Sequence, residues 1–150
     1  MKRNENLVPL SKDHHFGLLC VWKIRMGVKK GISYDRIRKY INYFWQKNLH
    51  SHFEVEDIVL PEIENASLLS QMEKEHVEIH RLINTINQSE DERLLLDFAN
   101  ALQSHIRFEE RVVFPNYEEM LSADQLDEIG NLLTKFHHKE EDDYADEFWK

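Results

Sequence analysis

The histidine–glutamate pairs His52 with Glu56 and His105 with Glu109 repeat one spacing within two similar segments. The surrounding segments, HFEVEDIVLP and HIRFEERVVFP, are alike, because each places a second acid after the glutamate and ends in a proline. Residues four apart share one face of an α-helix. Imidazole nitrogens and carboxylate oxygens together suit ions such as Fe, Mn or Zn. The two pairs therefore predict a metal site.

Two further histidines precede these pairs. His14 lies four residues after Leu10, and His76 lies four residues after Met72, so both fall on apolar helix faces. Each half of the chain then supplies one histidine followed by one histidine–glutamate pair. This order predicts two metal ions, one for each half of the site.

A metal-free interpretation has to explain why so many polar groups face the core. A single histidine on an apolar face is usually a hydrogen-bonded core residue, and His–Glu pairs also occur on exposed helices. The pair His50 and Glu54 is predicted to be of that exposed kind, because it shares its face with Asp57. Burying a charged group without a partner costs several kcal/mol, whereas a whole domain is stable by only about 5–15 kcal/mol. A bound cation would turn that cost into binding energy.

The elements that must position these residues are helices. Apolar residues recur at intervals of three and four, and no segment has the alternation of a β-strand. Helices are predicted over residues 11–30, with Ser11 as the N-cap, over 33–61 and over 67–88. Inward positions on these helices include Leu18, Val21, Trp22 and Trp45.

Two capping boxes mark further helix starts, Ser89 with Glu92 and Ser122 with Gln125. The helix after Ser89 is expected to turn Val112 inward. Four long helices with short connections predict an all-α fold, an up-down-up-down four-helix bundle with an additional C-terminal helix. We expect a single domain over residues 1–150, with the bundle at about 11–120 and the extra helix at about 122–148.

Composition limits the classes of function. The 150 residues carry a net charge of −9 with a pI near 5.4, which argues against a surface that binds nucleic acid or acidic membranes. The single cysteine, Cys20, cannot form a disulfide within the chain. No segment has the length and hydrophobicity of a signal peptide or a membrane span, so the sequence predicts a cytoplasmic protein.

At these residues the chain resembles the hemerythrin-like proteins, the HHE cation-binding domain family. The matching segments are LSKDHH at 10–15, HFEVED at 52–57, EHVEIH at 75–80 and HIRFEERVVFP at 105–115. The resemblance implies a four-helix bundle around a non-haem di-iron centre, with Glu56 and Glu109 bridging two Fe ions that Zn or Mn could replace. The ligands that it implies are His14, His52, Glu56, His76, His105 and Glu109.

The chain departs from the oxygen-carrying members of that family. Those proteins have a fifth histidine on the third helix, a place that His80 occupies here, and they end in HxxxxD where this chain has HxxxE. The HxxxE form is similar to the iron-sensing and iron-centre-repair branches. His80 and His15 are therefore additional candidate ligands. The proline follows His52 by nine residues and His105 by ten, and both prolines are interpreted as helix ends.

Other polar residues are interpreted as supporting or exposed groups. Asp13 and Glu75, each directly before a predicted ligand, are candidates for orienting ligands, although exposed helical carboxylates are common. His137 and His138 are predicted to lie on a solvated face of the last helix, with the acidic run after them also exposed.

Three functions remain open at this point. The first is a di-iron protein that binds O₂, NO or iron itself for sensing, storage or repair, with no protein partner indicated. The second is a di-iron oxidoreductase that acts on O₂ or peroxide, and the third is a metal-free helical interaction module. The spacing indicates no Ser–His–Asp or Cys–His catalytic arrangement and no organic cofactor.

Overall fold

The computed structural model describes residues 2–61 and 66–150, which form helices and no strand. The predicted all-α fold is confirmed. The described elements form five helical segments. They are α1 (Val8–Lys29); α2 (Tyr34–Phe44), η1 (Trp45–Leu49) and α3 (His50–Val59); α4 (Ala66–Asn87); α5 (Glu92–Phe108), η2 (Glu109–Val113) and α6 (Phe114–Met120); and α7 (Ala123–Phe136).

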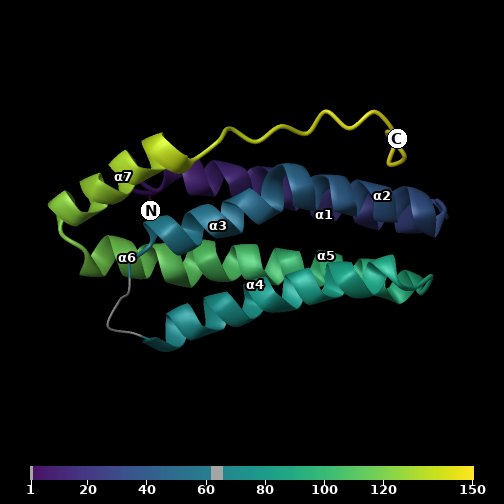
Figure 1. The fold of residues 1–150 in the computed structure, drawn as a ribbon, viewed down its shortest axis with the longest axis horizontal. Helices are drawn as coiled ribbons and strands as arrows, with labels where there is room; N and C mark the ends of the chain where they lie inside the picture. The colour runs from purple at the N-terminus through teal and green to yellow at the C-terminus, as the bar shows by residue number, and fades with distance from the viewer. Residues whose placement is uncertain (1, 62–65) are drawn as a thin grey trace.

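The long segments lie side by side in a bundle (Figure 1). α1 and α4 run from left to right in this view, whereas α2–α3 and α5–α6 run back. α5 packs against both α1 and α4, and α2 packs against α1, α4 and α5. α7 covers α3, and the chain after it returns along the side of the bundle that α1 and α2 form. No helix within the described ranges has the length and hydrophobicity needed to cross a membrane.

Helix ends follow local chemistry, with two corrections to the sequence interpretation. The capping box of Ser122 and Gln125 is present at the start of α7. The predicted box of Ser89 and Glu92 is wrong, because Asp91 is the N-cap and accepts a hydrogen bond from the backbone N–H of Arg93. Ser11 is likewise not an N-cap: α1 begins three residues earlier, with a proline in its first turn.

Two π-helical turns, η1 and η2, change which residues face the core. A π turn contains one more residue than the α-helical pattern requires, so the inward face moves by one position. Phe44 is 1% exposed while Trp45 is only half-buried, and Val113 is fully buried while Val112 is 42% exposed. The inward orientation predicted for Val112 is therefore wrong, whereas Trp45 lies at the edge of the core and is partly buried against it.

The inward face of α1 also differs from the prediction in part. Val21 is buried as expected, but Leu18 and Trp22 are 41% and 49% exposed. The run GLLCVW is apolar at every position, so its pattern cannot select one face, and Gly17 and Cys20 take the inward places. At Gly17 an added Cβ would lie 2.6 Å from Ile106 Cδ1, so glycine permits the close approach of α1 and α5.

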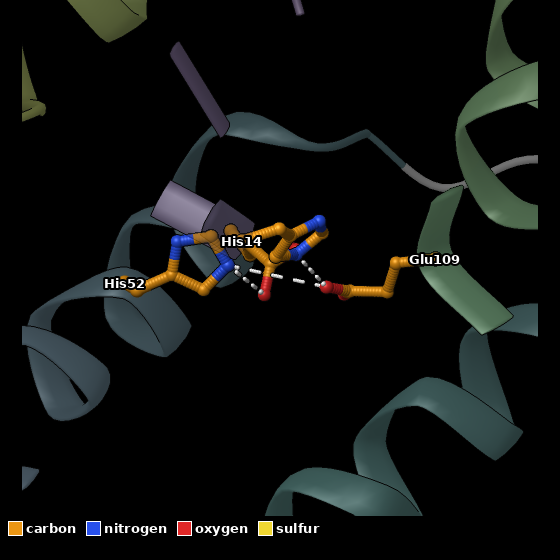
Figure 2. Close-up of side chains that lie close together, drawn as sticks. His14, His52 and Glu109 are labelled. Carbon is orange, nitrogen blue, oxygen red and sulfur yellow. Dashed lines mark hydrogen bonds and ion pairs between the residues drawn. The ribbon is translucent and has the colours of Figure 1, made fainter. Parts of the chain in front are cut away.

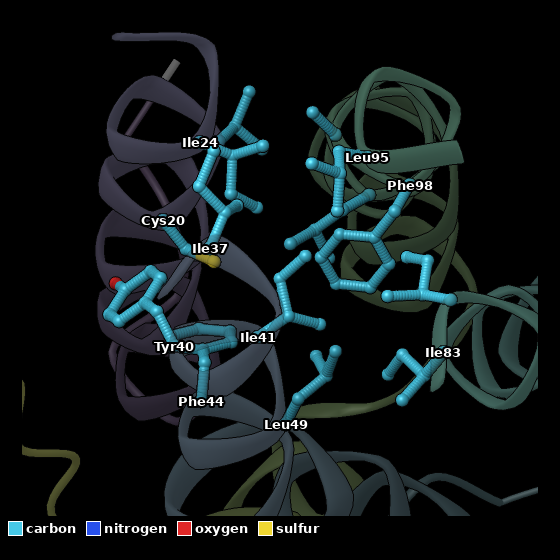
Figure 3. Packing of buried hydrophobic residues seen from close by; sticks show 14 of the residues in the cluster. Cys20, Ile24, Ile37, Tyr40, Ile41, Phe44, Leu49, Ile83, Leu95 and Phe98 are labelled. Carbon is cyan, nitrogen blue, oxygen red and sulfur yellow. The ribbon is translucent and has the colours of Figure 1, made fainter. Parts of the chain in front are cut away.

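The apolar core is divided into two clusters. One cluster, shown in Figure 3, contains Cys20, Ile41, Phe44 and Phe98, and burial raises the pKa of the Cys20 thiol. The other contains residues from the opposite end of the bundle, including Leu10, Val59, Met72, Val113 and Tyr117. On each long segment the predicted ligands lie close to the point where the chain passes from one cluster to the other. The polar groups therefore form a layer between two apolar ones.

The C-terminal segment is not helical over the predicted length. α7 ends at Phe136, and residues 137–150 form no helix. Acids crowd residues 140–143, and like charges at helical spacing repel each other. In the folded chain, Asp142 instead pairs with Lys23 of α1, and Phe148 and Trp149 join the first apolar cluster. We call residues 137–150 the C-terminal strap.

The two prolines have different positions relative to the helices. Pro61 follows the end of α3, as expected. Pro115 lies in the first turn of α6, and the helical segment continues to Met120, so its interpretation as a helix end is wrong. Because proline has no N–H, its position directly after η2 suits a segment whose regular hydrogen bonding is already interrupted. Tyr117 donates a hydrogen bond from its hydroxyl to the Pro61 carbonyl at 2.6 Å, which ties the two segments together.

Candidate metal centre

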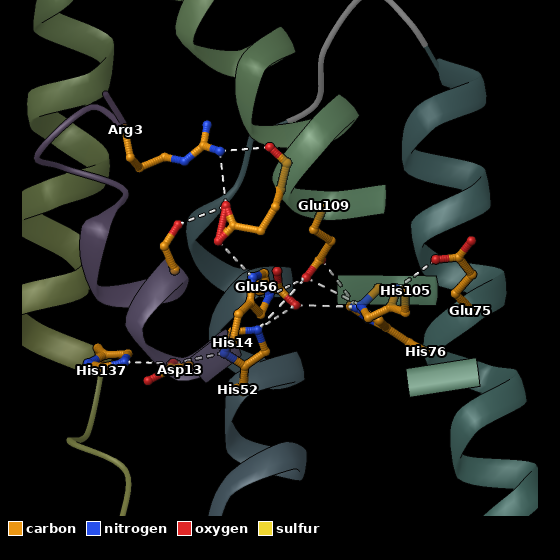
Figure 4. A network of polar contacts seen from close by, with 12 residues as sticks. Arg3, Asp13, His14, His52, Glu56, Glu75, His76, His105, Glu109 and His137 are labelled. Atoms are coloured by element: carbon orange, nitrogen blue, oxygen red, sulfur yellow. Dashed lines mark hydrogen bonds and ion pairs between the residues drawn. The ribbon is translucent and has the colours of Figure 1, made fainter. Parts of the chain in front are cut away.

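Six buried side chains from four helical segments converge in the polar layer (Figure 4). Each is at most 8% exposed, and both glutamates are fully buried. They form two groups of four whose ligand atoms lie within 4.8 Å of one another, and the groups share Glu56 and Glu109. The first group adds His14 and His52, and the second adds His76 and His105.

The histidines direct their Nε2 atoms at the shared carboxylates. In the first group, His14 Nε2 lies 2.9 Å from Glu109 Oε1 (Figure 2). His52 Nε2 lies 3.2 Å from Glu56 Oε1. In the second group, His76 Nε2 lies 3.3 Å from Glu56 Oε1, and His105 Nε2 lies 3.3 Å from Glu109 Oε1. Each glutamate is thus shared by histidines from both groups.

Most of these atoms face each other without hydrogen bonding. Nε2 of His52, His76 and His105, both carboxylate oxygens of Glu56, and Glu109 Oε2 find no hydrogen-bond partner among the described residues. Buried polar groups in folded proteins are nearly always paired, because an unpaired group costs free energy. Imidazole nitrogens and carboxylate oxygens that converge in this way fit a divalent cation, which would satisfy them together.

The opposite ring nitrogens contact four carboxylates that stand next to predicted ligands in the sequence. His52 Nδ1 lies 2.8 Å from Asp13 Oδ2, and His105 Nδ1 lies 2.7 Å from Glu75 Oε1. A neutral imidazole that donates from Nδ1 keeps the Nε2 lone pair free for a metal. The other two contacts are His14 Nδ1 with Glu110 Oε1 at 3.1 Å and His76 Nδ1 with Asp57 Oδ1 at 4.0 Å.

These contacts suggest a role for the acid that stands beside each predicted ligand in the sequence. Every supporting carboxylate is adjacent in sequence to one ligand but approaches a histidine on a different segment. Asp13 precedes His14 yet bonds His52, and Glu75 precedes His76 yet bonds His105. The repeated pattern of an acid beside a ligand was visible in the sequence, but its partners were not.

The ionisable side chains of this layer shift one another's pKa values. Burial alone would lower the pKa of His105, but Glu109 and Glu75 raise it to about 10. Burial also acts to lower the pKa of His52, yet Glu56 and Asp13 raise it well above the ordinary value. Conversely, burial acts to raise the pKa of Glu109, but His105 and other partners hold it well below the usual range. Because the same carboxylates favour the protonated imidazoles, protons compete with a metal for these ring nitrogens.

The C-terminal strap reaches this layer, which sequence reasoning missed. His137 Nε2 lies 2.8 Å from Asp13 Oδ2, the same oxygen that contacts His52. Glu140 is 8% exposed, and burial and the nearby Asp13 raise its pKa to about 8. The prediction that His137 lies on a solvated face is therefore wrong, whereas His138 is exposed. The acidic run is exposed only in part: Glu141 and Asp143 are exposed, but Glu140 is buried. No helical spacing relates these residues to α1, so the sequence offered no signal for the contact.

The remaining candidate histidines lie outside both groups. His80 is exposed, and its ring stacks on Trp45 with centroids 4.6 Å apart. His15 is also exposed and contacts the ring of Phe16. The pair of His50 and Glu54 forms an exposed ion pair, as predicted.

Comparison with known proteins gives one match. No curated protein and no solved structure matches the chain. The family model described as the hemerythrin HHE cation binding domain matches residues 13–117. This region spans all six converging side chains and ends in α6, while α7 and the C-terminal strap lie beyond it. The chain belongs to the hemerythrin HHE cation-binding domain family.

Proposed function

We propose that this protein is a non-haem di-iron protein whose centre is held by six side chains of an up-down-up-down bundle. The observation that carries the proposal is the convergence of buried, mostly unpaired imidazole nitrogens and carboxylate oxygens. Glu56 and Glu109 belong to both groups, so we assign them as bridges. The proposed ligands are His14, His52, Glu56, His76, His105 and Glu109.

The protein's own groups would prepare this site for a metal. Asp13, Glu75 and Glu110 accept hydrogen bonds from the Nδ1 atoms of three histidines and so fix the rings with Nε2 directed inward. A bound pair of iron ions would supply one-electron chemistry and open coordination positions. Zn or Mn could also occupy such a set of nitrogen and oxygen donors. We leave His80 and His15 out of the proposed set because both are exposed and contact other rings.

We further propose that the centre binds O₂, NO or iron itself in sensing, storage or repair. A second candidate is a di-iron oxidoreductase that turns over O₂ or peroxide. A cavity of about 400 Å³ borders Glu56 and His76, and its size would admit such small molecules.

The first test is metal content. Metal-free protein is titrated anaerobically with Fe(II), and we expect about two ions per chain; a chain that binds no ion would support the metal-free interaction module instead. The loaded protein is then exposed to O₂ and, separately, to NO while its visible spectrum is followed. A band that disappears when the gas is removed supports binding, whereas irreversible bleaching with consumption of peroxide supports an oxidoreductase.

His80→Ala serves as a control in the same titration. Because His80 lies outside both groups, we expect unchanged stoichiometry and an unchanged spectrum. Loss of the reversible band would place His80 among the ligands and contradict the proposed set.

A further inference from the structure

A cavity lies between α3 and α4, against the side of the centre that contains His76. Its volume is about 400 Å³, and Glu56 and His76 form part of its wall together with Asp57, Met72, Glu73 and Val77. Val77 is 69% exposed and the side chain of Asp57 is 59% exposed, so the cavity extends from the surface to the ligand layer.

Unpaired polar atoms lie at the inner end of this cavity. Glu56 is fully buried, and neither of its carboxylate oxygens has a hydrogen-bond partner among the described residues. Nε2 of His76 is also unpaired there. The wall of the cavity therefore includes donor atoms that a metal ion can use.

The charge of the cavity selects for cations. Asp57 and Glu73 add two carboxylates near its outer part, and no lysine or arginine of the described chain belongs to its wall. A cleft lined by one sign of charge raises the local concentration of ions of the opposite sign and speeds their association. The net charge of −9 acts in the same direction.

The other side of the centre offers no comparable passage. Beside His14, His52 and His105 the space amounts to about 10 Å³, which is about the volume of one water-sized probe. Of the four ligand histidines, only His76 borders the larger cavity. Glu140 of the C-terminal strap borders this small void.

From this asymmetry we propose that the cavity is the uptake path for divalent cations, and that ions enter the centre past Asp57 and Glu73 on the His76 side. The inference rests on the proposed function, because it concerns the same two groups of ligands. It adds that Glu73 affects the rate of loading rather than the number of ions bound.

The test measures uptake of Co(II) alone by metal-free protein, followed by stopped-flow visible absorption. The variant Glu73→Gln is compared with Glu119→Gln, which removes the same charge from an exposed position on α6. Asp57 is left in place because it also lies beside His76 Nδ1. At low ionic strength we expect the cavity variant to load about three- to tenfold more slowly than the control. The difference should nearly vanish at 1 M salt, and both variants should bind the same final number of ions.

A steric variant tests the same path independently of charge. Val77→Trp places a large ring at the cavity, whereas Met120→Trp places one at an exposed position on α6. We expect slower loading of Val77→Trp at both salt concentrations, with normal circular dichroism. Loading of the charge variant at the rate of its control would overturn the uptake path. Wild-type protein that binds no Co(II) or Fe(II) would contradict the proposed function itself, so the two failures are distinguishable.

Discussion

The His14–His52 side of the centre and the His76–His105 side contain the same kinds of residue but differ in what covers them. The first is covered by Phe114, whose ring stacks on His14, and by the C-terminal strap, which contacts Asp13 through His137. The second borders the cavity of about 400 Å³ through His76. Two similar sets of ligands can thus differ in how easily an ion from solvent reaches them, because this depends on the neighbouring segments and not on the ligands.

Removing a shared carboxylate should abolish the distinction between the two sides. Glu109→Ala takes a donor from both groups and leaves the Nε2 atoms of His14 and His105 without their carboxylate neighbour. Breaking such a buried network costs about 3–4 kcal/mol, so we expect both ions to bind about 100- to 1,000-fold more weakly. Calorimetric titration with Zn(II) measures the affinity. If one ion still binds with wild-type affinity, the two groups do not share Glu109.

Weakening the packing of the C-terminal strap should affect the His14–His52 side of the centre. Phe148 is 2% exposed in the first apolar cluster, and Phe148→Ala should lower the free energy of unfolding by about 3 kcal/mol. Urea unfolding measures that loss, with the exposed Met120→Ala as a control expected to change it by less than about 0.5 kcal/mol. We also expect faster removal of one of two bound ions by a chelator. Equal acceleration of both ions would contradict a covering role limited to one side.

Replacing one supporting carboxylate at a time should weaken metal binding on one side of the centre only. Asp13→Asn removes the charge beside His52, and Glu75→Gln removes the charge beside His105. Each change should weaken one of the two bound ions about 10- to 100-fold, because such outer contacts orient the ligand and raise its basicity. Asp13→Asn should have the larger effect, since it also weakens the contact with His137. The titration should show one affected and one unaffected ion in each variant.

A further prediction concerns the pH dependence of the metal-free protein. The pKa of His105 rises from its usual 6.5 to about 10 on folding, so its contribution to stability is fully present below about pH 6.5. That contribution is lost as the pH rises through about 10. Metal-free protein should therefore become less stable to urea across this range, while a loaded protein should not show this loss. Metal binding should release protons at neutral pH, which titration in buffers of different ionisation enthalpy detects.

Much of the ligand layer could be predicted from sequence because helical spacing is local. His52 and Glu56, or His105 and Glu109, are brought to one face by a single turn of helix, whatever the rest of the chain does. The structure brings both pairs together with His14 and His76. The inward helix faces were predicted less well at Trp45 and Val112, because the π turns change which residues face the core. No residue preference in the sequence marks the position of a π turn.

The sequence by itself determined the helical class, the spacing of the six donors and the acids that stand beside them. The tertiary structure decided which acid supports which histidine, that the strap reaches Asp13, and which side of the centre meets a cavity. The reason is sequence separation: His52 and Asp13 are 39 residues apart and His137 and Asp13 are 124 apart, so helical periodicity cannot relate them. Only the packing of whole segments against one another brings such groups together.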